Sequence, residues 1–171
     1  MNMIHRMGVR GALLVAVVAT IGCDRVTKHV ASAALAEGDV RSYLADTIRL
    51  EYVENTGGFL GLGSNLPAAW RTALFTGLTG VVLSGIVVVA VRSRWRGWLL
   101  IGGSLVVTGG ASNWIDRVVH GRVVDFLNLG VGPLRTGVFN VADVAIMLGV
   151  TVLLLAGAGP TDSDGRPVHI A

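Results

Sequence analysis

The stretch FNVADVAIML, Phe139 to Leu148, sets the lone acid Asp143 against apolar side chains, and GRVVDFLNLG, Gly121 to Gly130, does the same with Asp125. An ionised carboxylate in apolar surroundings is costly unless it is paired, hydrated or protonated. Asp143 has a possible structural reason, since Asn140 can cap a helix that begins there and an acid in a first helical turn is favourable. Two such acids make a purely structural explanation less satisfactory.

The composition is that of a membrane protein. Of 171 residues, 52% are hydrophobic and 15% are charged, and the mean hydropathy is +0.65, whereas an average soluble domain has roughly 25% charged residues. Neither internal repeats nor a low-complexity linker indicates a second module. We expect one membrane domain over residues 1–159, followed by a loose polar tail over residues 160–171.

Charge and cysteine content exclude several classes of protein. The net charge is +3 and the pI is about 9.8, but the basic residues are scattered or lie beside apolar segments, so nucleic acid is not an expected partner. Cys23 is the one cysteine, which rules out an intrachain disulfide and a cysteine metal cluster.

Four long apolar segments predict four transmembrane helices, because about 20 residues cross the hydrocarbon core. They cover about residues 9–36, 68–91, 97–115 and 141–159. Lys and Arg in short loops mark the cytoplasmic side. Such residues precede the first span and fill the turn between the second and third: Arg6, Arg10, Arg92, Arg94 and Arg96. Both termini are therefore expected in the cytoplasm, and segments 37–66 and 116–138 outside.

The outer segments contain strand patterns. TIRLEYVE, Thr47 to Glu54, alternates apolar with charged residues, and RVVDFLNL, Arg122 to Leu129, is rich in β-formers. Several of the 24 glycines lie at the spacing that allows close helix packing. The predicted fold is an integral membrane protein, mainly α, with four transmembrane helices and a small β-sheet on the outer face.

Polar residues gather near the predicted outer ends of the spans. In CDRVTKHVA, Asp24 and Lys28 share one helical face and can form an ordinary interfacial ion pair. In VENTGGFLGLG, Asn55 before Gly57 is typical of a hairpin or loop; a functional alternative has the Asn amide bind a substrate backbone that the glycines allow to approach.

The segment GGASNWIDRVVHGRVVDF is dense in polar groups for its place. On a helix, Asn113 lies within one turn of Asp116 and Arg117. A helix that merely ends needs a cap and some charge, not an amide, a carboxylate and a guanidinium on neighbouring turns. This density favours a functional site over a plain helix end.

Two carboxyls that meet suggest the chemistry of an aspartic protease. Like charges a few Å apart cannot easily both ionise, so Asp125 and Asp143 would share a proton and hold an acid and a base at neutral pH. Such a pair can activate water without metal or cofactor. The four dispersed histidines contain no H-E-x-x-H. A divalent ion between Asp116, Asp125 and Asp143 is a weaker alternative, because a magnesium site usually clamps phosphate.

These motifs resemble lipoprotein signal peptidase, also called prolipoprotein signal peptidase or signal peptidase II. The resemblance runs from about Cys23 to Ile146 through DRVTK, ENTGG, GGASNWIDRVVHGRVVDF and FNVAD, in the family's order. It implies that Asp125 and Asp143 are catalytic. The positions that it implies around the pocket are Asp24, Lys28, Asn55, Gly57, Asn113, Asp116, Arg117 and Asn140. The sequence departs from the family at Phe59, one place early, and at Ser112, where glycine is common.

The resemblance also implies the partners and the location. The family is a bacterial inner-membrane aspartic endopeptidase that removes the signal peptide of a diacylglyceryl-modified prolipoprotein, cutting just before the lipidated cysteine. It implies contact with membrane lipids, inhibition by globomycin and no cofactor, and we expect a monomer.

Other functions stay open from the sequence. Intramembrane acids also mark proton relays, so a small ion-coupled transporter is the main alternative, although it would place acids near mid-span. A structural assembly protein would need no acid pair. The N-terminal run that ends in TIGC at Cys23 also looks like a lipoprotein signal peptide, with Thr20 where leucine is usual.

Overall fold

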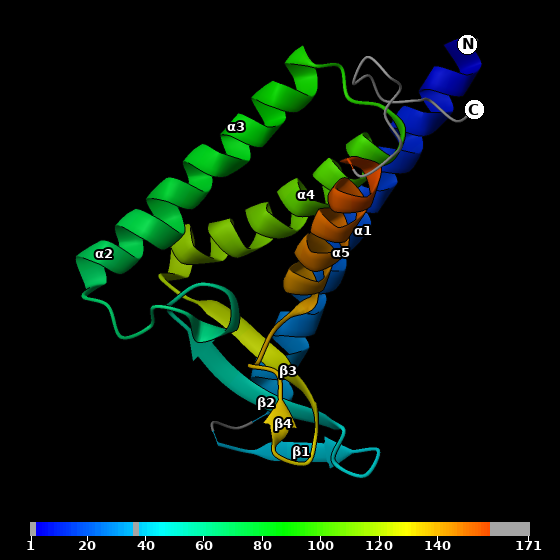
Figure 1. The fold of residues 1–171 in the computed structure, drawn as a ribbon. Helices are drawn as coiled ribbons and strands as arrows, with labels where there is room; N and C mark the ends of the chain where they lie inside the picture. Colours follow the sequence, from blue (N-terminus) through cyan, green and yellow to red (C-terminus); the bar gives the residue numbers. More distant parts are fainter. Residues whose placement is uncertain (1–2, 36–37, 158–171) are drawn as a thin grey trace.

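The computed structural model describes the backbone of residues 3–35 and 38–157, and the side chains of these residues from 16 onward. The predicted tail, residues 160–171, lies outside the described residues. Long helices pack side by side, and a small antiparallel sheet lies at one end of them (Figure 1). The start of α1 and the turn between α3 and α4 lie at the other end.

The helices lie close to the predicted spans. The first is α1 (Met3–Ala34). The second is a continuous helical run made of α2 (Ala68–Thr72), the π-helix η2 (Ala73–Leu78) and α3 (Thr79–Arg92). The third and fourth are α4 (Gly97–His120) and α5 (Val141–Gly157). In the described ranges, the Ala68–Arg92 helix alone has the length and composition to cross a membrane by itself, and Val141–Gly157 is a shorter apolar helix. The described residues thus contain four long helical segments near the predicted positions.

Helix α4 extends past the predicted span of residues 97–115. It continues to His120 and ends at Gly121, which adopts φ 71° as a left-handed C-cap. The Gly121 amide donates to the Arg117 carbonyl at 3.0 Å. The helix ends where a glycine can adopt the left-handed conformation without a Cβ penalty. Asp116 and Arg117, which precede this point, are therefore helical.

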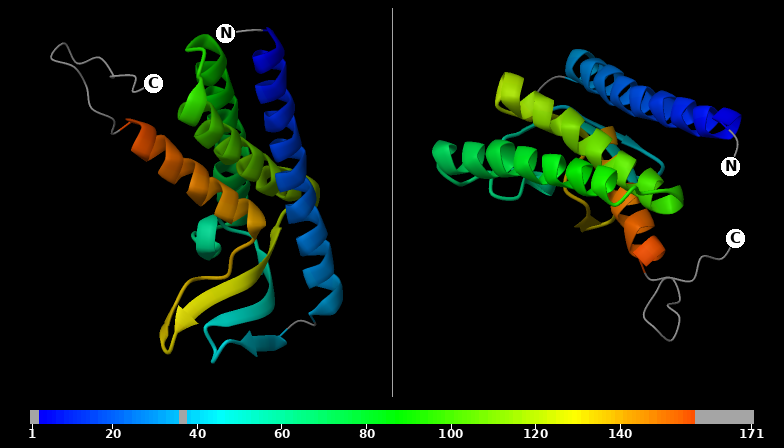
Figure 2. Two further views of the ribbon diagram at one scale, coloured as in Figure 1. Left: turned by 90° about the vertical axis from the view of Figure 1, so that its right-hand side faces the viewer. Right: turned by 90° about the horizontal axis from the view of Figure 1, so that it is seen from above.

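The sheet has four strands in the order β1-β2-β3-β4, all antiparallel. Its strands are β1 (Val40–Tyr43), β2 (Ile48–Asn55), β3 (Val123–Val131) and β4 (Leu134–Arg135). Both long strands were predicted, and β2 begins and ends one residue after the predicted stretch. The second half of α1 runs beside the sheet (Figure 2), so the sheet rests on a helix and is not an isolated hairpin.

Glycines bring α4 and α5 into backbone contact. A Cβ on Gly149 would lie 2.6 Å from the Gly102 carbonyl oxygen and 2.8 Å from Val106 Cγ2. A Cβ on Gly109 would meet the Ala142 carbonyl oxygen. This contact positions the first turn of α5, which carries Asp143, against the middle of α4, which carries Asn113. The small residues of both helices therefore fix the distance between these side chains.

We predict that Gly149→Val destabilises the protein. Overpacking of a tight contact costs about 1–3 kcal/mol, so the thermal midpoint of the detergent-solubilised protein should fall by several degrees. Gly85→Val is the matched control, because a Cβ there has no neighbour within 4 Å. Equal midpoints for the two variants would contradict the close packing of α4 and α5.

Candidate active site

Asp125 and Asp143 both lie beside Asn140 at the junction of sheet and helices. Asp125 lies on β3 and Asp143 in the first turn of α5, and their exposed fractions are 1% and 6%. Asn140 contacts both: its Nδ2 donates to Asp125 Oδ1 at 2.6 Å, and its backbone N–H donates to Asp143 Oδ2 at 3.1 Å. Two acids separated by 18 residues in sequence therefore share one neighbour.

Asn140 is also the cap of α5. Its Oδ1 accepts the backbone N–H of Asp143 at 3.0 Å, while Asp143 Oδ2 accepts the N–H of Asn140. This reciprocal pattern is a capping box with Asp in place of Glu. The helix-capping role suggested for Asn140 and Asp143 is therefore confirmed. Asn140 has this role and also bonds to Asp125. The other oxygen, Asp143 Oδ1, accepts Asn113 Nδ2 at 2.9 Å.

Asn55 holds the other side of Asp125. Its Nδ2 donates to Asp125 Oδ2 at 2.7 Å and to the Gly58 carbonyl at 2.9 Å, and its Oδ1 accepts the Gly57 N–H at 2.9 Å. Asn55 is thus engaged within the protein in this structure and orients a carboxylate. The alternative in which its amide binds a substrate backbone stays a prediction.

The loop after β2 folds on itself through its glycines. A Cβ on Gly57 would lie 2.5 Å from the Leu62 carbonyl oxygen, and one on Gly58 would lie 2.8 Å from the Phe75 ring. Gly57 thus admits the protein's own backbone, and Gly58 admits the Phe75 ring. Arg117 fixes this loop, since Nη2 and Nε donate to the Gly57 carbonyl at 2.6 and 3.2 Å.

Lys28 stands at the centre of a buried ionic cluster. Its Nζ donates to Asn113 Oδ1 at 2.8 Å and to Asp116 Oδ2 at 2.7 Å, and it lies 2.7 Å from Asp24 Oδ2. Arg25 Nη1 lies 2.5 Å from Asp116 Oδ1. The predicted pair of Asp24 and Lys28 exists, but it is buried and joined to α4, unlike an ordinary interfacial pair.

Asp24 links three helices. Its Oδ2 accepts Ser112 Oγ at 2.6 Å, and its Oδ1 accepts the backbone N–H of Ala142 at 3.0 Å. The side chain is fully buried. Because Ala142 lies in the first turn of α5, an acid from α1 satisfies one of the amides that a helix start leaves unpaired. Ser112, where the family commonly has glycine, supplies a bond that glycine cannot.

Burial changes the pKa of Asp125, the acid on β3. It raises the pKa of the Asp125 carboxyl above its ordinary value, and the hydrogen bonds from Asn55 and Asn140 oppose the rise by favouring the ionised form. The geometry thus supports both protonation states. A carboxyl in this position stays protonated to higher pH than an exposed aspartate does.

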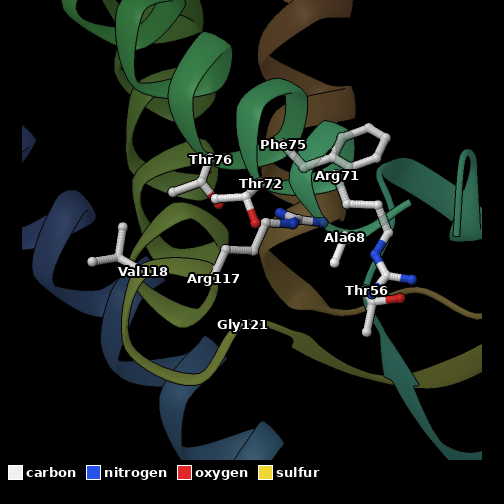
Figure 3. A pocket seen from close by; sticks show the side chains of 9 residues that line it. All are labelled: Thr56, Ala68, Arg71, Thr72, Phe75, Thr76, Arg117, Val118 and Gly121. Carbon is white, nitrogen blue, oxygen red and sulfur yellow. The ribbon is translucent and has the colours of Figure 1, made fainter. Parts of the chain in front are cut away.

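A cavity of about 230 Å³ lies next to the Asn55 loop, between α2, η2 and the end of α4. Figure 3 shows the side chains of Arg117, from α4, and Arg71, from α2, lining it from opposite sides. Thr56, Thr72 and Thr76 add hydroxyls, and Phe75 adds an apolar surface. The cavity thus offers polar groups suited to a peptide backbone beside the loop that holds Asp125.

The residues suggested for a divalent ion do not form one cluster. Asp116 is bound by Arg25 and Lys28, while Asp125 and Asp143 are bound by asparagines. Across residues 16–35 and 38–157, no group of three or more His, Cys, Asp or Glu is placed to hold a metal ion.

The sequence reasoning missed two connections. Arg25 was not singled out, although it lies inside the DRVTK motif and its partner Asp116 was. The bond from Ala142 to Asp24 spans 118 positions, and no spacing rule could find it.

Comparison with known proteins identifies the family. The family model described as signal peptidase (SPase) II matches residues 16–158. Proteins named lipoprotein signal peptidase are similar: one from Streptococcus pneumoniae is 31% identical over 86% of this chain and 92% of its own length, and one from Brevibacillus brevis is 35% identical over 79% and 87%.

Solved structures share the fold. A structure described as a bacterial membrane enzyme superposes with a TM-score of 0.75 at 24% identity, covering 85% of this chain and 87% of the other. A second has a TM-score of 0.73 at 24% identity over 88% and 95%. The family match over most of the chain decides the assignment: this chain belongs to the signal peptidase (SPase) II family of aspartic peptidases.

Proposed function

We propose that Asp125 and Asp143 are the catalytic dyad of this signal peptidase II. The observation that supports the proposal is that two buried carboxyls from different elements are both hydrogen-bonded to Asn140. Family membership makes the protein a lipoprotein signal peptidase of a bacterial membrane, and it favours the peptidase over the ion-coupled transporter that the sequence left open.

The reaction follows from one proton shared by two carboxyls. The ionised partner takes a proton from a water molecule as the water oxygen attacks the carbonyl carbon of the scissile peptide bond. The protonated partner donates to the carbonyl oxygen, which gives a tetrahedral intermediate. As the C–N bond breaks, the carboxyl that took the water proton passes it to the leaving nitrogen, and the other carboxyl takes back a hydroxyl proton, so the amine leaves and the pair again holds one proton. No covalent intermediate forms. The proton belongs to the pair, and neither acid holds it permanently.

The surrounding polar residues position this pair. Asn55, Asn113 and Asn140 donate to the carboxylates, and Lys28 orients Asn113 through its Oδ1. Asp24 and Asp116 neutralise Lys28 in turn. Arg117 and Gly57 set the loop that carries Asn55. These residues act on the reaction through the carboxyls or through the loop.

The substrate is a prolipoprotein, and we propose that cleavage occurs just before its diacylglyceryl-modified cysteine. The lipid would hold that cysteine at the membrane surface, and the signal helix would lie in the bilayer, so the scissile bond would reach the junction of helices and sheet. A globomycin-type cyclic peptide would compete for the same place. We propose that the enzyme works as a monomer.

We further propose that residues 1–159 form one domain of the inner membrane with four spans and both termini in the cytoplasm. The α3–α4 turn, with Arg92, Arg94 and Arg96, would then lie inside, in agreement with the positive-inside rule. The sheet and the dyad would lie on the outer side, where translocated substrates arrive.

Replacement of either acid should abolish cleavage. Asp125→Asn and Asp143→Asn retain the shape of the side chain but cannot share a proton, so the rate should fall at least about 100-fold. The assay is the gel shift of a diacylglyceryl-modified prolipoprotein, run with a chelator present.

Asp39→Asn is the matched control for these variants, since Asp39 is an exposed acid before β1. A folded Asp125→Asn or Asp143→Asn protein that cuts at the wild-type rate would remove the dyad from the proposal. Loss of wild-type cleavage on addition of the chelator would instead indicate a metal-dependent reaction.

The pH profile should report the raised pKa of Asp125. Because burial raises this pKa, the pair keeps its shared proton to higher pH than an ordinary aspartate, and kcat/KM should fall as pH rises through that value. Asn55→Leu removes a hydrogen bond that favours the ionised form, so it should move this alkaline limb upward by about one pH unit.

Asn128→Leu serves as the control for the pH experiment. Asn128 is a buried asparagine on the same strand, but it bonds to Thr136 and Arg135 and not to the dyad. The alkaline limb of the kcat/KM profile of Asn128→Leu should stay at the wild-type pH. A downward shift for Asn55→Leu, or equal shifts in both variants, would contradict the assignment.

The topology can be tested with single cysteines in a Cys23→Ser background. Leu44 lies at the exposed tip of the β1–β2 hairpin and Ser93 in the exposed α3–α4 turn. A membrane-impermeant maleimide should label Leu44→Cys from the outside of intact cells and Ser93→Cys only after permeabilisation. The reverse pattern would invert the orientation, and labelling of both in intact cells would exclude the four-span arrangement.

A further inference from the structure

A second pocket lies beside the buried ionic cluster, and Arg25, Lys28 and Asp116 of that cluster line it. It has a volume of about 390 Å³ and is formed by α1, α4 and the two long strands β2 and β3. Its lining contains five basic or titratable nitrogen-bearing side chains: Arg25, Lys28, His29, His120 and Arg122. Asp116 is the one acid that lines it.

The acids near this pocket are already bound. Both oxygens of Asp116 accept charged hydrogen bonds, from Arg25 and from Lys28. Lys28 directs its ammonium group inward to Asp24, Asn113 and Asp116 and has no donor left for a ligand. The groups that can face a ligand are therefore the outer parts of Arg25 and Arg122 and the exposed His29 and His120.

Arg122 forms an exposed ion pair, unlike the buried ion pairs of Lys28. Its Nε lies 3.2 Å from Glu54 Oε1, and the two side chains are 49% and 38% exposed. Arg25, at 37%, also keeps part of its guanidinium open to solvent. An exposed pair of this kind contributes little to stability, so Arg122 can turn from Glu54 toward a stronger anion. Guanidinium groups bind phosphate by two parallel hydrogen bonds.

The borders of the pocket are apolar and exposed. On α1, Val26 and Val30 each follow a pocket residue by one position and are 62% and 56% exposed. On α4, Ile115 and Val119 each precede one and are 38% and 65% exposed. One step along a helix turns a side chain by about 100°, so both helices present apolar surface beside the basic groups. This combination suits an amphiphile better than a free ion.

We propose that this pocket binds the phosphate of an anionic membrane phospholipid in preference to a zwitterionic one, with Arg25, His29, His120 and Arg122 around the headgroup and the acyl chains against the exposed valines. The proposal rests on the proposed membrane topology, which places the junction of helices and sheet at the membrane surface. A lipid there would adjoin the Lys28 cluster that orients Asn113, so its occupancy would also stabilise the site.

The test is lipid binding by the full-length protein in detergent, followed by native mass spectrometry with phosphatidylglycerol or phosphatidylcholine of the same acyl chains. The wild type should retain phosphatidylglycerol in preference. The double variant His120→Gln with Arg122→Gln should lose at least roughly fivefold in apparent affinity, because it removes the charge of one arginine. Arg122→Lys, which keeps the charge, should restore most of the loss relative to Arg122→Gln.

Controls separate the site from general surface charge and from free phosphate. Arg41→Gln removes an arginine of β1 that donates to the Ala34 carbonyl and does not line the pocket, and it should bind lipid as the wild type does. Equal retention of both lipids, or an equal loss in Arg41→Gln, would overturn the proposal. Displacement of phosphatidylglycerol by millimolar inorganic phosphate alone would assign the pocket to a small anion and would also overturn it.

The same samples should be assayed for prolipoprotein cleavage. His120 and Arg122 lie outside the catalytic arrangement, so the double variant should retain cleavage in a detergent without added lipid. Loss of lipid preference with cleavage intact would support the lipid site independently of the dyad, whereas a wild type that binds the lipid but does not cut would leave the lipid site standing and count against the peptidase.

Discussion

The first turn of α5 is the feature on which the site depends. A helix start leaves backbone N–H groups without partners, and here side chains from two other places in the chain satisfy them. Asn140 accepts from Asp143, and Asp24 of α1 accepts from Ala142. Since Asn140 also donates to Asp125, the contacts that begin the helix are the contacts that bring the two acids together. The proposed chemistry would therefore use the same atoms that stabilise the start of the helix.

The buried cluster beside this turn is compatible with an apolar protein because its charges are matched. Lys28 has three partners, and each of its two acids has a further donor, Ser112 for Asp24 and Arg25 for Asp116. Removing one member would leave a buried charge uncompensated, at a cost of about 3–5 kcal/mol. Such a cluster holds one geometry, and this keeps Asn113 directed at Asp143.

Local patterns predicted the elements but not how they meet. The alternation in residues 47–54 located β2 to within one residue, and the apolar segments located the helices. Helix capping at Asn140 was also readable, because it involves neighbours in sequence. The bonds from Asp24 to Ala142 and from Arg25 to Asp116 depend on which helices cross. The crossing of α4 and α5 is set by glycines such as Gly102 and Gly149, whose role appears only when both helices are in place.

The Asn55 loop shows the same limit. Asn55 and the glycines after it were considered as a surface for substrate, because sequence shows a flexible loop and not what the loop folds against. In the structure Gly57 packs on residues 62–64, and Asn55 turns inward to Asp125. A carboxyl that must alternate between ionised and protonated forms needs both burial and donors. Burial alone would keep Asp125 protonated, and hydrogen bonds alone would keep it ionised. With two amide donors on a nearly inaccessible carboxyl, the two influences oppose each other, and a proton can move at little cost.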